Sequence, residues 1–250
     1  MIKLILSGCN GYMGRVLTAL VNASPDITIV AGVDINAQKT VEYPVFRNPH
    51  EITMDADVVI DFSSPSALED LLAYSKEKKL PLVLCATGYS PDQITQIESA
   101  SAQIPVFRSG NMSLGINLLA DLIKRACAVL GEDFDIEIVE RHHRRKVDAP
   151  SGTALMLADA AASGLSHKPQ YVYERQSKTE PRSSHEIGIS AVRGGTIVGV
   201  HDVIFAGQDE VIELRHSAAS REVFATGAIK AAKFIIGKPS GMYDMNDVLR

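Results

Sequence analysis

The sequence is poor in cysteine and has no long apolar run, and each shortage excludes a class of protein. Cys9, Cys85 and Cys127 are far apart, which fits neither a disulfide framework nor the spacing of a zinc site, so no metal centre is expected. Free thiols are typical of a reducing compartment. No segment approaches the ~20 consecutive apolar residues of a membrane-spanning helix, and the short apolar N-terminal stretch runs directly into a glycine-rich turn, unlike a signal peptide. We therefore expect a cytoplasmic protein without a membrane partner.

The sequence also lacks an excess of positive charge. Lys and Arg number 25 against 30 Asp and Glu, so the formal net charge is −5. This balance argues against a general nucleic-acid binder, whose affinity depends on neutralising phosphates, although it leaves room for a local basic pocket. The 250 residues are 46% hydrophobic, enough to bury a sizeable core in one large or two small domains.

The first 110 or so residues alternate between short apolar segments and helical patterns. The apolar segments are residues 3–7, 27–33, 58–61, 82–85 and 106–107, and the helical patterns between them are residues 13–23, 65–78 and 91–102. The segments are nearly continuous in Val, Ile and Leu, as is typical of strands buried on both faces. This alternation predicts a parallel, Rossmann-type sheet with right-handed crossovers.

The pattern changes after Asn111, which indicates a second architecture. A long helix (113–130) precedes a strand (135–140), a charged run and a helix (151–163). A polar segment, 169–182, is the expected mobile loop. Three alternating strands (186–193, 196–206 and 209–218) and a helix (221–236) complete the chain. We predict an α/β fold with a smaller α+β domain containing a mixed or antiparallel sheet.

The turn after the first strand has the glycine pattern of a dinucleotide site. Gly8, Gly11 and Gly14 follow the strand and open a helix, and Asp34 ends the next strand twenty positions beyond Gly14. Such glycines let the backbone approach a pyrophosphate at the helix N-terminus, and the acid would accept hydrogen bonds from the adenosine ribose. The spacing GxxGxxG is less specific than GxGxxG, and a glycine-rich turn without a ligand is the alternative. Small and polar residues after later strands, Cys85-Ala86-Thr87 and Ser109-Gly110-Asn111-Met112, would face the nicotinamide.

Asp34 also affects the choice between NADH and NADPH. A carboxylate repels a 2′-phosphate, which favours NADH, whereas nearby Lys39 could neutralise that phosphate. We expect NADH to be preferred or both cofactors to be used.

The densest group of chemically active residues follows the strand 135–140. Two histidines, three arginines and a lysine occupy positions 141–146, with His142, His143 and Lys146 able to transfer protons or bind anions. Ser151 is a good helix N-cap, so the N–H groups of Gly152 and Thr153 would offer a carboxylate site. A solvated basic loop or a nucleic-acid patch is the alternative. The combination predicts a small anionic substrate.

At these residues the sequence resembles the 4-hydroxy-tetrahydrodipicolinate reductase family, formerly called dihydrodipicolinate reductases. The resemblance covers nearly the whole chain, through VERHHRRKVDAPSGTA, SGCNGYMGR, SGNMSLGIN, AVRGGTIVGVHDVIFAG and HSAASREVFATGAIKAA. It implies reduction of a cyclic dicarboxylic imine, or its hydrated precursor, by NADH or NADPH in diaminopimelate and lysine biosynthesis. It also implies a homotetramer that associates through the sheet of the second domain.

The resemblance assigns roles to individual residues. His142 and Lys146 would be proton donors, and His143, Gly152 and Thr153 would hold a substrate carboxylate. The cofactor would contact Gly8, Cys9, Asn10, Gly11, Tyr12, Met13, Asp34, Cys85, Ala86, Thr87, Ser109, Gly110, Asn111 and Met112. Residues 1–112 with 222–250 would form the dinucleotide-binding domain, and residues 113–221 the substrate-binding and oligomerisation domain.

Three positions depart from the family pattern. Cys85-Ala86-Thr87 stands where Gly-Thr-Thr is common, Ile35 where some members place an arginine beside the 2′-phosphate, and Val200 where a glutamate is frequent. The first two concern cofactor preference, and none removes a proposed catalytic residue. Other readings are an amino-acid or sugar dehydrogenase, a regulator that binds NADH without turnover, and an inactive paralogue.

Overall fold

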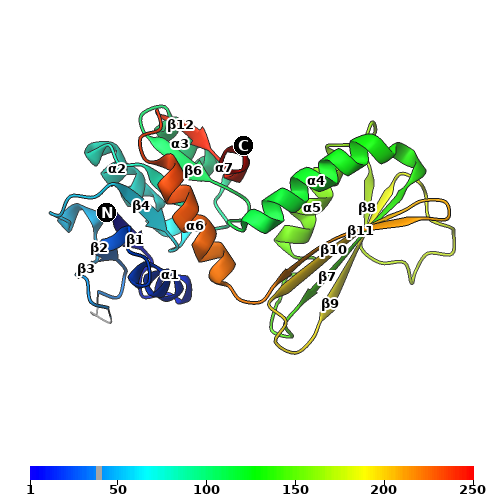
Figure 1. Cartoon of the computed structure of the whole chain (residues 1–250), viewed down its shortest axis with the longest axis horizontal. Helices are drawn as coiled ribbons and strands as arrows, with labels where there is room; N and C mark the ends of the chain where they lie inside the picture. Colours follow the sequence, from blue (N-terminus) through cyan, green and yellow to red (C-terminus); the bar gives the residue numbers. More distant parts are fainter. Residues whose placement is uncertain (38–40) are drawn as a thin grey trace. The chain divides into compact units, whose positions relative to one another are not determined.

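The computed structural model describes residues 1–37 and 41–250, which divide into two compact units (Figure 1). Unit 1 comprises Met1–Ser113 and Arg221–Arg250, and unit 2 comprises Leu114–Ser220. The chain therefore leaves unit 1, builds unit 2 and returns. These boundaries lie one residue from the sequence-based divisions at 112/113 and 221/222.

Unit 1 is built on a seven-stranded sheet in which every neighbouring pair is parallel. Its order is β12-β6-β5-β4-β1-β2-β3. The strands are β1 (Ile2–Ser7), β2 (Ile27–Val33), β3 (Val45–Phe46), β4 (Val58–Asp61), β5 (Leu82–Leu84), β6 (Pro105–Arg108) and β12 (Gly241–Tyr243). The direction in which the chain adds strands reverses between β1 and β4. In open parallel sheets, ligands bind beyond the carboxyl ends of the strands at such a point.

Helices cover this sheet, and the central residues of β1, β4 and β5 are fully buried, whereas the edge strands β3 and β12 are partly exposed. The helices are α1 (Tyr12–Asn22), α2 (Leu68–Lys78), α3 (Pro91–Ser101), α6 (Glu222–Ile235) and α7 (Met245–Leu249), with short 3-10 turns at Pro49–Glu51 and Pro65–Ala67. Local sequence sets several ends: Ser90 and Gln93 form a capping box at the start of α3, and Lys79 ends α2 in a left-handed conformation. The returning helix α6 needs Gly227, because a Cβ there would lie 1.7 Å from the Met112 carbonyl oxygen.

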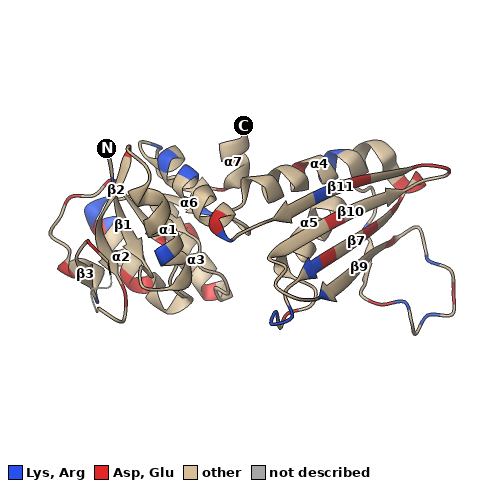
Figure 2. Ribbon diagram, turned by 60° about the horizontal axis from the view of Figure 1, so that its bottom comes forward, with Lys and Arg blue, Asp and Glu red and all other residues tan. Residues whose placement is uncertain are grey.

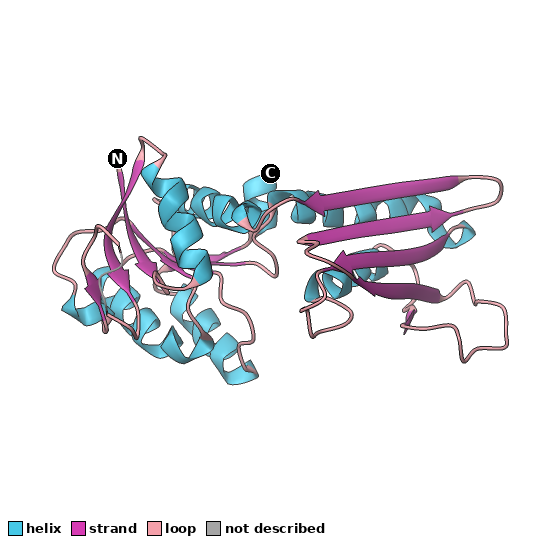
Figure 3. Cartoon of the chain, turned by 90° about the horizontal axis from the view of Figure 1, so that it is seen from below, coloured by secondary structure: helices cyan, strands magenta, loops and turns pink. Residues whose placement is uncertain are grey.

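Unit 2 is a mixed five-stranded sheet of order β11-β10-β7-β9-β8, with two helices on one face (Figure 3). Its strands are β7 (Asp135–His142), β8 (Gln170–Val172), β9 (Glu186–Arg193), β10 (Gly199–Ala206) and β11 (Val211–Ala218). The helices are α4 (Leu114–Leu130), followed by the 3-10 turn Gly131–Asp133, and α5 (Gly152–Ala162). A core including Ile123, Leu157 and Phe205 fills the space between the helices and the sheet. The predicted fold class is thus confirmed in both units.

The structure differs from the sequence-based elements mainly at sheet edges. β3, β8 and β12, of two or three residues each, were not predicted, and β8 lies within the expected mobile loop 169–182. Such short strands are specified by hydrogen bonding to a neighbouring strand rather than by their own pattern. β7 continues to His142, two residues beyond the predicted end, so this histidine belongs to a strand. Among the described residues, no helix is both long enough and apolar enough to cross a membrane.

Candidate active site

A buried carboxylate, Glu140, lies at the centre of the candidate site in unit 2. Along β7 the even-numbered residues from Ile136 to His142 are buried and the odd-numbered ones are half-buried, so Glu140 shares the inner face with the core residue Ile138. Its side chain is fully buried. A charge in this place requires hydrogen-bond donors around it, since an uncompensated buried charge is very unfavourable.

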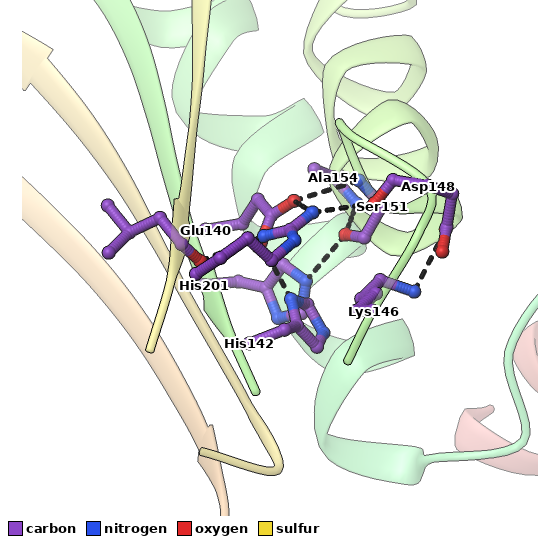
Figure 4. Close-up of polar contacts among 9 residues, drawn as sticks. Glu140, His142, Lys146, Asp148, Ser151, Ala154 and His201 are labelled. Carbon is purple, nitrogen blue, oxygen red and sulfur yellow. Dashed lines mark hydrogen bonds and ion pairs between the residues drawn. The ribbon is translucent and has the colours of Figure 1, made fainter. Parts of the chain in front are cut away.

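Three groups from different segments donate to this carboxylate (Figure 4). Arg193 at the end of β9 forms a bidentate pair, at 2.7 and 2.8 Å, with the two Glu140 oxygens. His142 Nδ1 lies 2.6 Å from Oε2, and the backbone N–H of Ser151 donates to Oε1 at 2.9 Å. Burial by itself raises the pKa of Glu140, but these donors outweigh it and hold the pKa below its ordinary value.

This network joins the end of β7 to the beginning of α5. Ser151 is the N-cap of α5, and its hydroxyl accepts a hydrogen bond from the Ala154 N–H at 3.2 Å. Because the Ser151 N–H is bound to Glu140, the helix begins at a fixed place beside His142. Gly152, in the first turn, is exposed, a Cβ there would meet nothing within 4 Å, and its N–H has no acceptor within the helix.

The loop 143–150, which connects β7 to α5, carries the basic residues beside this network. Figure 2 shows the tip of the loop in blue, because Arg144, Arg145 and Lys146 follow one another there. The backbone of Arg144 bonds to Gly195 at 3.2 Å, which ties the loop to the β9–β10 turn. Lys146 Nζ pairs with Asp148 at 2.9 Å, and Arg141 pairs with Asp202. The cluster is therefore partly neutralised by neighbouring acids.

His201 belongs to the same site and comes from β10, the antiparallel neighbour of β7. Its ring packs edge-on against His142 at a centroid distance of 5.2 Å, and its Nε2 is 3.2 Å from the Ser151 hydroxyl. Burial is the main reason that its pKa falls to about 4. The charges of His142, His216 and Lys146 lower it further, and Glu140 opposes them. His201 is thus neutral near pH 7.

The sequence analysis singled out His142, His143, Lys146, Gly152 and Thr153 as candidates, and the structure places them between the end of β7 and the start of α5. It gave no role to Glu140, Arg193 or His201. The sequence did contain a signal for Glu140, because this charged residue is at an inward-facing position of a strand with alternating burial. Arg193 and His201 come close only through strand register, because Arg193 pairs with His142 and His201 with Glu140.

In unit 1, the turn between β1 and α1 requires its glycines. Gly8 has a φ of +75°, and a Cβ there would lie 2.7 Å from the Phe62 carbonyl group. A Cβ on Gly14 would lie 2.2 Å from the Gly8 carbonyl oxygen. Gly11 caps α1 without any side-chain hydrogen bond, so the first-turn N–H groups of the helix are left for a ligand.

A cavity of about 520 Å³ opens beside this turn at the switch point between β1 and β4. Gly8, Asn10, Gly11 and Asp34 line it, together with Arg47. The Asp34 carboxylate accepts the N–H groups of Asn10 and Asn36, each at 3.0 Å, which fixes it at the end of β2. A glycine cradle, a helix N-terminus and a fixed acid fit the pyrophosphate and ribose of a dinucleotide.

Other predicted cofactor residues lie outside the lining of this cavity. Cys9 is fully buried, and burial raises the pKa of its thiol to about 11. Tyr12 is exposed and its ring faces Arg221, whereas Met13 is half-buried. Cys85-Ala86-Thr87 follow β5, and Ser109-Gly110-Asn111-Met112 follow β6, on the same carboxyl edge of the sheet. Lys39 lies outside the described residues.

Two family models together match almost the whole chain. Residues 2–112 match the N-terminal part of dihydrodipicolinate reductase, and residues 115–249 match its C-terminal part. The chain belongs to the dihydrodipicolinate reductase family. It is therefore an oxidoreductase with a Rossmann dinucleotide-binding half.

Relatives in this family are similar over their full length. The chain is 53% identical to a 4-hydroxy-tetrahydrodipicolinate reductase of Clostridium tetani, covering 100% of this chain and 97% of the relative. It is 54% identical to the enzyme of that name from Caldanaerobacter subterraneus, covering 100% and 99%. A solved dipicolinate-bound dihydrodipicolinate reductase from a Paenisporosarcina species has the same fold, with a TM-score of 0.83 at 24% identity, covering 98% of this chain and 99% of that one.

Replacing Glu140 by Gln should destabilise this family member, because Arg193 and His142 lose their buried counter-charge. We expect the free energy of unfolding to fall by about 3 kcal/mol in denaturant titrations. The double variant Glu140→Gln/Arg193→Met should lose less than the sum of the two single variants. Glu213→Gln, at an exposed position of β11, is the control and should change stability by less than about 0.5 kcal/mol. An unchanged Glu140→Gln variant would show that the network contributes nothing to stability.

The neutral, buried His201 should make stability depend on pH. In the unfolded chain the histidine binds a proton below about pH 6.5, whereas in the folded chain it binds one only near pH 4. The unfolded state therefore holds more protons between these values, and stability falls as the pH drops, by up to about 1.4 kcal/mol per pH unit from this group. We expect denaturant titrations at several pH values between about 6.5 and 5 to show that the free energy of unfolding of His201→Gln depends less steeply on pH than that of the wild type. His50→Gln, at an exposed position, should keep the wild-type dependence of stability on pH. An equal pH dependence in all three proteins would contradict the lowered pKa of His201.

Proposed function

We propose that this protein reduces 4-hydroxy-tetrahydrodipicolinate to tetrahydrodipicolinate with NADH or NADPH, in diaminopimelate and lysine biosynthesis. The observation that carries the proposal is the fixed His142 beside the basic loop and the start of α5. The relatives at 53% and 54% identity, which span the whole chain, are named for this reaction and support it. Unit 1 would be the dinucleotide-binding domain and unit 2 the substrate-binding and oligomerisation domain.

A small dicarboxylate fits the charges of the candidate site. The first-turn N–H groups of α5, at Gly152 and Thr153, would hold one carboxylate together with His143. Arg144 and Arg145 are exposed and form no ion pair with any described residue, so the loop retains positive charge for an anion. The solved relative from Paenisporosarcina is bound to dipicolinate, itself a cyclic dicarboxylate.

His142 and Lys146 would supply protons. Glu140 orients the His142 ring through Nδ1, which leaves Nε2 directed away from that carboxylate. Lys146 is held by Asp148 in the same loop. When bound, NADH or NADPH supplies the hydride for an electron-poor ring carbon. The hydride and one proton reduce the ring, and the 4-hydroxyl group leaves as water. The chain's own contribution would be to position the substrate and to deliver protons.

In unit 1, Gly8, Asn10, Gly11 and Asp34 would hold the pyrophosphate and the adenosine ribose. Cys9, Tyr12 and Met13 would contribute through the backbone of the same turn. The segments Cys85-Ala86-Thr87 and Ser109-Gly110-Asn111-Met112 would contact the nicotinamide end. We further propose a cytoplasmic homotetramer joined through the sheet of unit 2, where Val192 and Val211 are exposed apolar residues on β9 and β11.

The assignment of His142 and Lys146 predicts a specific kinetic defect. Replacing both by Ala should lower kcat by about 100-fold or more, because two proton donors are lost, and should change the NADH dissociation constant by less than about twofold. NADH absorbance is followed with the freshly generated aldol product of pyruvate and aspartate semialdehyde, and NADH binding is followed by fluorescence. The paired control is His50→Ala/Lys230→Ala, at exposed positions of unit 1, which should retain full activity. Wild-type turnover in the first variant would refute these roles, and a wild-type protein without turnover would refute the proposed reaction.

The cavity residues predict dual use of cofactors with NADH at least as good. Asp34 disfavours a 2′-phosphate, while Arg47, on the same cavity, offers a positive charge to it. We expect kcat/KM for NADH to be equal to or higher than that for NADPH, and a value for NADPH more than about tenfold above that for NADH would contradict this prediction. Asp34→Asn should raise the NADPH-to-NADH ratio and Arg47→Gln should lower it. If this NADPH-to-NADH ratio changes in the same direction in both variants, or in neither, these side chains do not contact the 2′ position of the bound cofactor.

A further inference from the structure

A cluster of metal-ligand type lies in unit 2, outside the candidate active site. Its members are Glu132, His167 and His185, hereafter the Glu132 cluster, and one ligand atom of each lies within 4.8 Å of the others. His167 Nδ1 is 2.9 Å from Glu132 Oε1, and His185 Nε2 is 4.0 Å from Glu132 Oε2. The two imidazole rings stack at a centroid distance of 4.1 Å. Both rings thus bring a nitrogen to the same carboxylate.

The three residues come from three connecting segments, each fixed by its own contacts. Glu132 is in the 3-10 turn that follows α4, directly after Gly131, whose φ is +62°. His167 follows α5, where Gly164 is pressed so closely on α4 that a Cβ would lie 2.5 Å from the Lys124 carbonyl oxygen. The His185 carbonyl accepts the Gln170 N–H at 2.8 Å, just before β9 begins. The backbone thus sets the cluster in place independently of any ligand.

The chemistry of the cluster suits a borderline divalent metal ion rather than a proton network alone. Two imidazoles and one carboxylate form a common zinc ligand set, whereas magnesium and calcium prefer oxygen ligands. The Glu132 Oε1 atom also accepts a hydrogen bond from the Ser166 hydroxyl at 3.0 Å, which helps to orient the carboxylate. His167 contacts the cluster through its Nδ1 atom. Its other ring nitrogen, Nε2, is buried without a hydrogen-bond partner among the described residues.

We propose that Glu132, His167 and His185 form a zinc-binding site at the end of unit 2 where β7 begins. The ligands would be His167 Nδ1, His185 Nε2 and a Glu132 oxygen, with the fourth tetrahedral position open to water. In a tetrahedral zinc site the ligand atoms lie about 3.3 Å apart. Zinc binding would therefore draw the three side chains closer and turn the His185 ring out of its stack on His167, because a metal ion lies near the plane of each imidazole that binds it. Such shifts are feasible because the His185 and Glu132 side chains are 58% and 48% exposed.

The site has a structural consequence. A zinc ion there would fasten the ends of the segment 167–185, which contains β8 and a long loop, to the turn between α4 and β7. Glu132 is three residues before β7, while His142 ends that strand, so the eight residues of β7 separate the two sites by about 25 Å. The sequence analysis expected no metal centre, because the spacing of the three cysteines fits no zinc site. Glu132, His167 and His185 did not enter that argument, since they are far apart along the chain.

Calorimetric titration of the untagged full-length protein with zinc at pH 7.5 tests the site. We expect one equivalent to bind in the micromolar range or tighter, and thermal unfolding to shift upward with zinc and back with EDTA. His185→Gln and Glu132→Gln should each weaken zinc binding by at least about tenfold. His50→Gln and Glu213→Gln, exposed residues of the same types elsewhere, are matched controls and should bind zinc as the wild type does. Magnesium and calcium chloride should give no binding.

Several outcomes would overturn the proposal. A wild-type protein that binds no zinc below about 100 µM has no such site. Zinc binding that survives both His185→Gln and Glu132→Gln would place the ion elsewhere, for example on the histidines of the candidate active site. Because the His185 side chain is largely exposed, its variant should keep the wild-type far-UV circular dichroism, so loss of binding in a folded protein reports on the ligand set.

Discussion

The buried ion pair between Glu140 and Arg193 is the constraint on which the candidate active site depends. Arg193 also donates to the Asp148 carbonyl oxygen at 2.6 Å, so one side chain joins β9, β7 and the basic loop. The Glu140 carboxylate also fixes the His142 ring and the backbone of Ser151, the N-cap residue of α5. Without this carboxylate, the imidazole would lose its orientation and the helix N-terminus its position, although neither Glu140 nor Arg193 need touch a substrate.

The candidate sites of the two units both use a helix N-terminus, but the two are built in different ways. In both, a strand leads through a short or long connection into a helix whose first N–H groups attract anions. In unit 1 the approach is opened by removing side chains, at Gly8, Gly11 and Gly14, and the cap of α1 is a glycine. In unit 2 the cap is Ser151, and a buried acid holds it. The first device suits a long pyrophosphate along the backbone, and the second a compact carboxylate beside a proton donor.

Much of the fold could be predicted because its strands are continuous apolar segments and its turns carry glycine, which are local signals. β3, β8 and β12 escaped prediction since their existence depends on a neighbouring strand, such as β6 for β12. The site shows the same division. His142, His143 and Lys146 occur in one short run, whereas Arg193 is 53 residues from Glu140 and meets it only through the parallel register of β7 and β9. Register is a property of the folded sheet, and nothing local in the sequence encodes it.

The charges explain why an anion should complete the site in unit 2. Arg193 is neutralised by Glu140, Arg141 by Asp202 and Lys146 by Asp148, while His201 is kept neutral by burial beside His142. The nearby acids are therefore already paired, and Arg144 and Arg145 on the exposed loop have no acidic partner among the described residues. The proposed dicarboxylate would bring the missing negative charge to the loop that leads into the N-terminus of α5. Its binding would relieve a repulsion that folding leaves in place, beside the proposed proton donors.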